Sequence, residues 1–162
     1  MRVSGFLDKA PTIPLFVFFV EGQRCALSLP VVQRVLLMIA VSPLPEAPEV
    51  VLGVINLRGD VLPVVDVRRR LGFPPRPYGP AARLVVARTA RRALALAVDE
   101  ALGVAEVDAA TITSADDLVP GTRYVAGIVA LPDGLLFIHD LDTLLSLDDE
   151  RRLDQALGGV PR

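Results

Sequence analysis

The chain has 162 residues, of which 52% are apolar, 5% aromatic and 22% charged, and its formal net charge at pH 7 is −2. This charge and the few aromatic residues argue against partners that need a basic surface, namely nucleic acids and anionic membranes. A domain of this length can bury about 70% of its unfolded surface without covalent staples. The high apolar content also indicates surface that another protein covers.

A single cysteine, Cys25, excludes an internal disulfide and fits a reduced, cytosolic setting. It lies in an apolar run and is interpreted as a small core residue rather than a nucleophile. The longest apolar stretch, Cys25–Val41, is interrupted by Pro30, Gln33 and Arg34, and it is shorter than the ~20 apolar residues of a membrane-spanning helix. We therefore expect neither a membrane span nor a signal peptide.

The first half of the chain alternates short apolar runs with turn residues, which predicts short strands. In chain order we expect a loose arm, a strand pair, a helical turn opened by Pro30, a further strand and a connector stiffened by prolines. These elements cover residues 1–14, Leu15–Val20 with Cys25–Leu29, Val31–Val35, Leu36–Val41 and Ser42–Pro48.

A β-hairpin is the strongest pattern, over Gly53–Asp66 (Gly-Val-Ile-Asn-Leu-Arg-Gly-Asp-Val-Leu-Pro-Val-Val-Asp). Two apolar, β-branched runs flank Gly59-Asp60, which we expect to form the loop because glycine tolerates a positive φ. Asn56, Arg58 and Asp60 place polar groups at the bend. A cation held on a rigid turn amid apolar surface suits docking onto another protein better than it suits chemistry.

A helical turn is predicted over Arg68–Leu71, with Asp66 as its N-cap and Gly72 as its stop. Its three consecutive arginines have no neighbouring aromatic platform, so we interpret them as a solvated face rather than a nucleic-acid site. The proline-rich stretch Phe73–Pro80 cannot sustain a helix or a ladder, and we expect it to separate two halves.

The second half repeats the plan of the first, and a helix follows it. We expect a strand pair, a strand, an irregular polar segment, a hairpin around Pro132-Asp133-Gly134 and a helix capped by Asp140. These cover Leu84–Ala87 with Ala93–Val98, Leu102–Val107, Asp108–Tyr124, Gly127–Asp140 and about 141–157. The acidic run Asp148-Asp149-Glu150 is interpreted as a solvated surface of that helix.

The two hairpins align without a gap, with Gly53 against Gly127 and Asp66 against Asp140. This duplication predicts a mainly β fold of two packed small barrels of about five strands each. Within one domain over 1–162, we expect the first subdomain at about 15–72, the second at about 81–140 and a C-terminal helix. Because the second hairpin has ordinary turn residues, the polar bend of the first is the better candidate for function.

At these residues the chain resembles the CheW-type chemotaxis coupling proteins. The motifs that carry the resemblance are Leu44-Pro45-x-x-Pro48, Gly53–Gly59, Pro63–Asp66, Val98-Asp99 and Tyr124-x-x-Gly127, within residues 15 to 147. The resemblance implies two five-stranded SH3-like barrels and a cytoplasmic, non-enzymatic adaptor without a cofactor. It also implies that the adaptor joins the cytoplasmic tip of a chemoreceptor to the regulatory domain of a CheA-type histidine kinase.

We therefore expect the residues that bind receptor or kinase on the first hairpin and on the segment before its connector. They are Asn56, Arg58, Gly59, Gly53, Val32, Arg34 and Val35. Arg34 stands where many members carry an acidic residue, a charge reversal that can change which receptor is accepted.

Each of these residues also has a structural interpretation. Arg58 can pair within its own barrel, for example with Asp66. Asn56 and Gly59 can serve only to shape the turn, and the two valines can be core residues.

Two other classes of function stay open as alternatives. Small OB-like barrels bind nucleic acids, although the charge and aromatic content speak against such a module here. The only histidine, His139, stands beside Asp140 and suggests a His–Asp relay, but no nucleophile motif accompanies it, so we interpret it as structural. Asp140 and Asp142 lack further ligands at a metal-binding spacing, and no metal is expected.

Overall fold

This computed structural model describes residues 11–114 and 124–158. Residues 1–10 of the predicted arm and residues 115–123 of the predicted irregular segment lie outside the described residues. The described elements are β1 (Thr12–Val20), β2 (Gln23–Ser28), η1 (Leu29–Val31), β3 (Val32–Leu37), β4 (Val51–Leu57), β5 (Asp60–Asp66), α2 (Val67–Arg70), β6 (Arg83–Arg88), β7 (Ala93–Val98), β8 (Glu100–Asp108), η2 (Ala109–Thr111), β9 (Ile112–Ser114), β10 (Val125–Leu131), β11 (Gly134–His139), η3 (Leu141–Thr143) and α4 (Leu147–Gly158).

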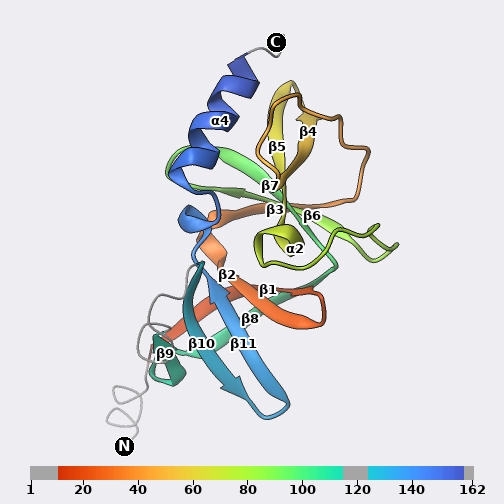
Figure 1. Cartoon of the computed structure of the whole chain (residues 1–162). Coiled ribbons are helices and arrows are strands. Elements are labelled where there is room, and N and C mark those ends of the chain that lie inside the picture. The colour runs from red at the N-terminus through yellow and green to blue at the C-terminus, as the bar shows by residue number, and fades with distance from the viewer. Residues whose placement is uncertain (1–10, 115–123, 159–162) are drawn as a thin grey trace, which may run out of the picture.

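The strands form two sheets, with α2 between them and α4 beside the second (Figure 1). The first sheet has six strands in the order β8-β1-β2-β11-β10-β9, and the second has five in the order β3-β6-β7-β5-β4. Each sheet has an apolar cluster whose buried members all lie on its own strands, and a third cluster packs both sheets against η3 and α4. The predicted mainly β fold class, with two small packed units, is confirmed.

The two sheets do not correspond to the predicted subdomains at 15–72 and 81–140. The β1–β2 hairpin joins the first sheet through a parallel pairing of β2 with β11. The β6–β7 hairpin joins the second sheet through a parallel pairing of β7 with β5. Each sheet therefore takes one hairpin from one half of the chain and its other strands from the opposite half. A sequence repeat predicts that the two halves of the chain contain equivalent strands. It does not predict whether a strand pairs within its own half or with the other half.

The predicted equivalence of the two long hairpins is present in detail. β4–β5 and β10–β11 each have an irregular register just before the aligned glycine, Gly53 or Gly127. A Cβ at Gly53 would lie 2.1 Å from the Ser42 carbonyl oxygen, and a Cβ at Gly127 would lie 2.8 Å from Ile112 Cγ2. In both hairpins the glycine therefore admits a neighbouring chain segment. Ser42 uses this space to form a bridge to Val54.

The predicted helical turn over Val31–Val35 is wrong, and the strand predicted over Leu36–Val41 both begins and ends earlier in the chain. The helical turn is η1, which ends at Val31, and residues Val32–Leu37 form β3. β-branched valines favour an extended chain, and the antiparallel pairing of β3 with β6 places Val35 opposite Val85. Pairing with a distant strand thus outweighs the local helix-start signal of Pro30.

The C-terminal helix also differs from its prediction. Asp140 caps only the short η3, and α4 begins at Leu147. The Ser146 hydroxyl accepts the Asp149 N–H at 3.0 Å, while the Asp149 carboxylate accepts the Ser146 N–H at 3.0 Å. This reciprocal capping by Ser146 and Asp149 starts a new helix, and the spacing of the two residues is a helix-start pattern that can be recognised in the sequence.

The arginines of α2 are not the solvated face that the sequence suggested. Arg68 is only 2% exposed, donates from Nε to Asp99 Oδ1 at 2.7 Å, and stacks 3.8 Å from the centre of the Tyr78 ring. Its Nη1 donates to the Arg76 carbonyl at 2.8 Å, and Glu21 lies 3.4 Å from its Nε. Arg68 therefore links α2 to the β1–β2 turn, to the residue between β7 and β8, and to the proline-rich segment.

The other two arginines and the acidic run are engaged as well. Arg69 donates to the Glu49 carbonyl at 2.9 Å, and Arg70 pairs with Asp149 of α4. Glu150, 4% exposed, accepts from Arg92 Nε at 2.8 Å. The interpretation of Asp148-Asp149-Glu150 as a solvated surface is therefore wrong for its last two residues, which hold α4 against the second sheet and α2.

Cys25 lies in the core as predicted. It is 0% exposed, and burial raises the pKa of its thiol to about 12. The thiol is therefore neutral at physiological pH, whereas nucleophilic chemistry would need the thiolate.

Candidate docking surface

The β4–β5 hairpin ends in a two-residue turn made of Arg58 and Gly59. β4 ends at Leu57 and β5 begins at Asp60, and these two residues pair across the hairpin. The φ angles of 53° at Arg58 and 90° at Gly59 are those of a type I′ turn. The predicted loop, Gly59-Asp60, is therefore displaced by one residue, because this turn places its glycine second.

Arg58 is exposed and makes no hydrogen bond or ion pair with any described residue. The alternative of pairing with Asp66 is excluded, since Asp66 is 3% exposed and accepts instead from the Arg69 N–H and the Tyr78 hydroxyl. A positive φ disfavours every side chain that has a Cβ, so Arg58 occupies a costly backbone position. Its guanidinium is available to another molecule.

The other predicted residues of this hairpin have identifiable local roles. Asn56 Oδ1 accepts the Gly59 N–H at 2.9 Å, and this hydrogen bond between a β4 side chain and the turn backbone stabilises the turn. Both residues are exposed. Gly53 is buried, and the approach of Ser42 accounts for it. Substitution of Gly53 would therefore act first on the fold.

Val32, Arg34 and Val35 lie on β3, which occupies the opposite edge of the second sheet from β4. The two predicted groups of residues therefore lie on opposite edge strands. Arg34 is exposed and Val35 is 39% exposed, whereas Val32 is half-buried against the shared cluster. The core interpretation therefore fits Val32 better than Val35.

Sequence reasoning missed further exposed apolar side chains on two edges. Leu37, 67% exposed, follows Val35 on β3, and Ile39, just after the end of this strand, is also exposed. On β8, the edge strand of the first sheet, Val104 is 60% exposed and Leu102 is also exposed. Apolar side chains at every second position of these strands were the signal from which the exposed ones could have been predicted. This alternation does not show which face of the strand another strand or helix of the fold covers.

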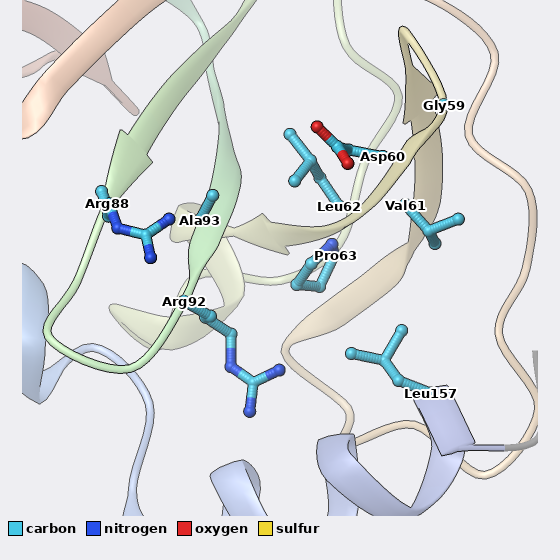
Figure 2. Close-up of a pocket in the computed structure, with 9 residues that line it drawn as sticks. All are labelled: Gly59, Asp60, Val61, Leu62, Pro63, Arg88, Arg92, Ala93 and Leu157. Atoms are coloured by element: carbon cyan, nitrogen blue, oxygen red, sulfur yellow. The ribbon is translucent and has the colours of Figure 1, made fainter. Parts of the chain in front are cut away.

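A cleft of about 330 Å³ lies between the hairpin, the β6–β7 turn and the end of α4 (Figure 2). Its residues are Gly59, Asp60, Val61, Leu62, Pro63, Arg88, Arg92, Ala93 and Leu157. Arg92 is held by Glu150 and Asp154, whereas Arg88 is exposed and has no partner among the described residues. No sequence motif pointed to this cleft, because it joins three segments that are distant in the chain.

The predicted alternative of a His–Asp relay is not formed. His139 is 6% exposed, and neither of its ring nitrogens makes a hydrogen bond with a residue that the structure describes. Asp140 instead accepts the Asp142 N–H at 3.1 Å as the cap of η3. Within residues 11–114 and 124–158, no three metal-ligating side chains gather at one point.

A family model described as a CheW-like domain matches residues 14–149, most of the chain. The chain belongs to the CheW family. The chemotaxis protein CheW of Rhizobium meliloti is 30% identical over 139 residues, which cover 83% of this chain and 88% of that protein. The chemotaxis protein CheW of Bacillus subtilis is 31% identical over 146 residues, which cover 88% of this chain and 94% of that protein.

The fold agrees with a solved CheW structure. The crystal structure of the scaffolding protein CheW from Thermoanaerobacter tengcongensis matches with a TM-score of 0.78 at 26% identity, over 86% of this chain and 96% of that one. The predicted chemotaxis adaptor is therefore confirmed, and the chain is not an enzyme. The alternative of a nucleic-acid-binding barrel is not supported. Across the described part of the chain, no helix has the length and apolarity needed to cross a bilayer.

Proposed function

We propose that this CheW-family adaptor couples the cytoplasmic tip of a chemoreceptor to the regulatory domain of a CheA-type histidine kinase, in the cytoplasm. The single observation that supports docking at the β4–β5 hairpin is Arg58, an exposed guanidinium that pairs with no described residue and stands on a turn that disfavours its residue type. The adaptor works by fixing the geometry between its two partners, because it has no reaction to perform.

The guanidinium of Arg58 is suited to a carboxylate or to backbone carbonyls of a partner, since its planar fork donates two parallel hydrogen bonds. Asn56 and Gly59 support it by closing the type I′ turn. A short hairpin whose turn is locked by a side chain presents the cation with little conformational freedom, which lowers the entropy cost of binding.

The edge strand β3 is the second part of the proposed surface. Arg34 and the exposed apolar side chains of Val35, Leu37 and Ile39 offer a charge beside hydrophobic contacts. Edge strands with exposed apolar side chains are rare in isolated proteins because they invite pairing, so a partner that covers this row accounts for it. Arg34 favours an acidic residue at the matching position of that partner.

The decisive test replaces Arg58 with asparagine, which fits a positive φ better and carries no cation. Binding to receptor cytoplasmic fragments and kinase regulatory domains from the same genome is measured by calorimetry. We expect Arg58→Asn to weaken binding of at least one partner about fivefold or more. We also expect its thermal unfolding midpoint to stay equal or rise.

The matched control is Arg91→Ala, which removes another exposed arginine from the β6–β7 turn of the same sheet. Its binding is expected to equal that of the unmodified chain. Unchanged binding in Arg58→Asn, or a lowered unfolding midpoint with normal binding, would show that Arg58 serves the fold and not the partner.

A further inference from the structure

The cleft of about 330 Å³ beside the β4–β5 turn, which we call the hairpin cleft, borders the proposed docking residue (Figure 2). It is lined by residues 59–63 of the hairpin, by Arg88, Arg92 and Ala93 around the β6–β7 turn, and by Leu157 of α4. Gly59 belongs to the turn that presents Arg58, so the cleft is continuous with the proposed docking site. A cavity of about 150 Å³ can hold benzene, and the hairpin cleft therefore has room for a large apolar side chain.

The hairpin cleft exists because the second sheet opens at this end. β5 runs from Asp60 to Asp66, but it pairs with β7 only from Val64 to Asp66. Among the described residues, no strand therefore neighbours the edge of residues 60–63 that faces away from β4. Pro63 has no N–H to donate, so a partner strand cannot continue the ladder here. The cleft is suited to a side chain rather than to an added strand.

The apolar side chains of the hairpin cleft provide its fixed surface. Leu62 is 7% exposed and Pro63 is buried, so both are held in place by the fold. Val61 and Leu157 are half-buried, and they line the cleft from the hairpin and from the last turn of α4. An apolar side chain in the cleft would cover the parts of Val61 and Leu157 that solvent still reaches, which is favourable.

The charged residues of the hairpin cleft do not make a ligand site by themselves. Arg92 is already engaged, because its Nε donates to Glu150 at 2.8 Å and its guanidinium also pairs with Asp154. Arg88 and Asp60 are exposed, have opposite charges, and pair with no described residue. Such groups select no small charged ligand, so recognition in the cleft must come from its apolar wall.

We propose that the hairpin cleft receives a large apolar side chain, that of leucine, methionine or phenylalanine, from the partner segment whose carboxylate pairs with Arg58. This inference rests on the proposed function and adds a second contact of the same segment. An ion pair that stays exposed to solvent contributes little to affinity, whereas buried apolar anchors contribute much of it.

The adjacency of Arg58 and Gly59 limits the sequence of that partner segment. Its carboxylate and its apolar side chain must lie close together. Two residues one helical turn apart meet this requirement, since their Cβ atoms are about 5–6 Å apart. The expected partner is therefore an acidic amphipathic helix rather than an extended strand.

The test replaces Leu157 with alanine. Binding to receptor cytoplasmic fragments and kinase regulatory domains from the same genome is measured by calorimetry. We expect Leu157→Ala to weaken, by about threefold or more, the same partner that Arg58→Asn weakens. The matched control is Leu147→Ala, which removes the same side chain from the first turn of α4, where it is 70% exposed and outside the cleft. The control should bind as the unmodified chain does.

A second variant is needed because Leu157 also packs against the cluster shared by the two sheets, so its loss can lower stability. Val61→Thr keeps the β-branched shape that suits a strand and places a hydroxyl in the wall of the cleft. It should weaken the same partner by about twofold or more. Thermal unfolding midpoints of all variants separate a change in binding from a change in the fold.

The proposal fails if neither Leu157→Ala nor Val61→Thr weakens the partner that depends on Arg58, or if they weaken only the other partner. Either result would leave the docking role of Arg58 intact. Loss of binding in Leu157→Ala without loss in Arg58→Asn would overturn both proposals. Sedimentation of the chain alone tests a second copy as the occupant, and a dimer that Leu157→Ala dissociates would also contradict the proposal.

Discussion

His139 couples the stability of the protein to pH. Its pKa is about 4 in the folded chain because of burial, against an ordinary value of 6.5. The unfolded chain therefore binds more protons between these values, so stability is complete above about pH 6.5 and falls as the pH drops toward 4. The charged residues that line the same cleft as the ring, Asp140, Asp142 and Arg88, are exposed to solvent.

We expect His139 to lower the free energy of unfolding by about 2 kcal/mol between pH 7.5 and pH 5. The measurement is urea unfolding at both pH values, with His139→Leu as the comparison, because the carboxylates shared by both proteins contribute equally. The leucine variant should lose less stability over this range by that amount. Equal losses in the two proteins would mean that the ring is not buried in a neutral state.

At the scale of the secondary-structure element, the bulge at Gly53 holds the connector against β4. The Ser42 N–H donates to the Val54 carbonyl at 2.9 Å, and the Val54 N–H donates to the Ser42 carbonyl at 2.8 Å. Gly53 has a φ of 154°, and a Cβ there would lie 2.1 Å from the Ser42 oxygen. Because a backbone atom cannot yield as a flexible side chain does, the two hydrogen bonds must break.

Gly53→Ala is therefore expected to lower the free energy of unfolding by about 2 kcal/mol or more. Gly79→Ala is the matched control, since nothing lies within 4 Å of its added Cβ and its φ is not in the left-handed region. That variant should differ from the parent by less than about 0.5 kcal/mol. Chemical denaturation of both variants measures the difference, and equal stabilities would contradict the close approach of Ser42.

The elements that sequence predicts well are those whose signals are local. The hairpin over Gly53–Asp66, its alignment with the second hairpin and the cap at Asp66 depend on turn and cap residues within a few positions. The partners of Arg68 and Arg70 lie 31 and 79 positions away, at Asp99 and Asp149. No local pattern identifies such partners, so the arginines of α2 resemble a solvated basic run until the strands are placed.

The same limit applied to the candidate docking surface. The sequence predicted that Arg58 lies on a turn and can bind a partner, because polar residues at an apolar bend form a local pattern. It did not separate β3 from the hairpin, since the order of strands in a sheet depends on pairing between distant segments.

For the whole molecule, the crossed pairing of the halves makes each half depend on the other. Residues 1–74 contain β1–β2 without the strands β8 and β11 that flank it, and β4–β5 without its parallel partner β7. Residues 75–162 lack the complementary strands. In addition, Arg68 in the first half pairs with Asp99 in the second, and removing one member of a buried pair is strongly destabilising.

We therefore expect the chain cut between Pro74 and Pro75 to behave as two interdependent fragments. Pro74 and Pro75 are exposed, so the cut lies in the proline-rich segment outside both sheets. Each fragment alone should show poor dispersion of its amide resonances, because neither completes a sheet. Mixed in equal amounts, the fragments should recover the dispersed spectrum of the intact chain. If either fragment folded alone, contiguous subdomains at 15–72 and 81–140 would describe the molecule better than the crossed sheets do.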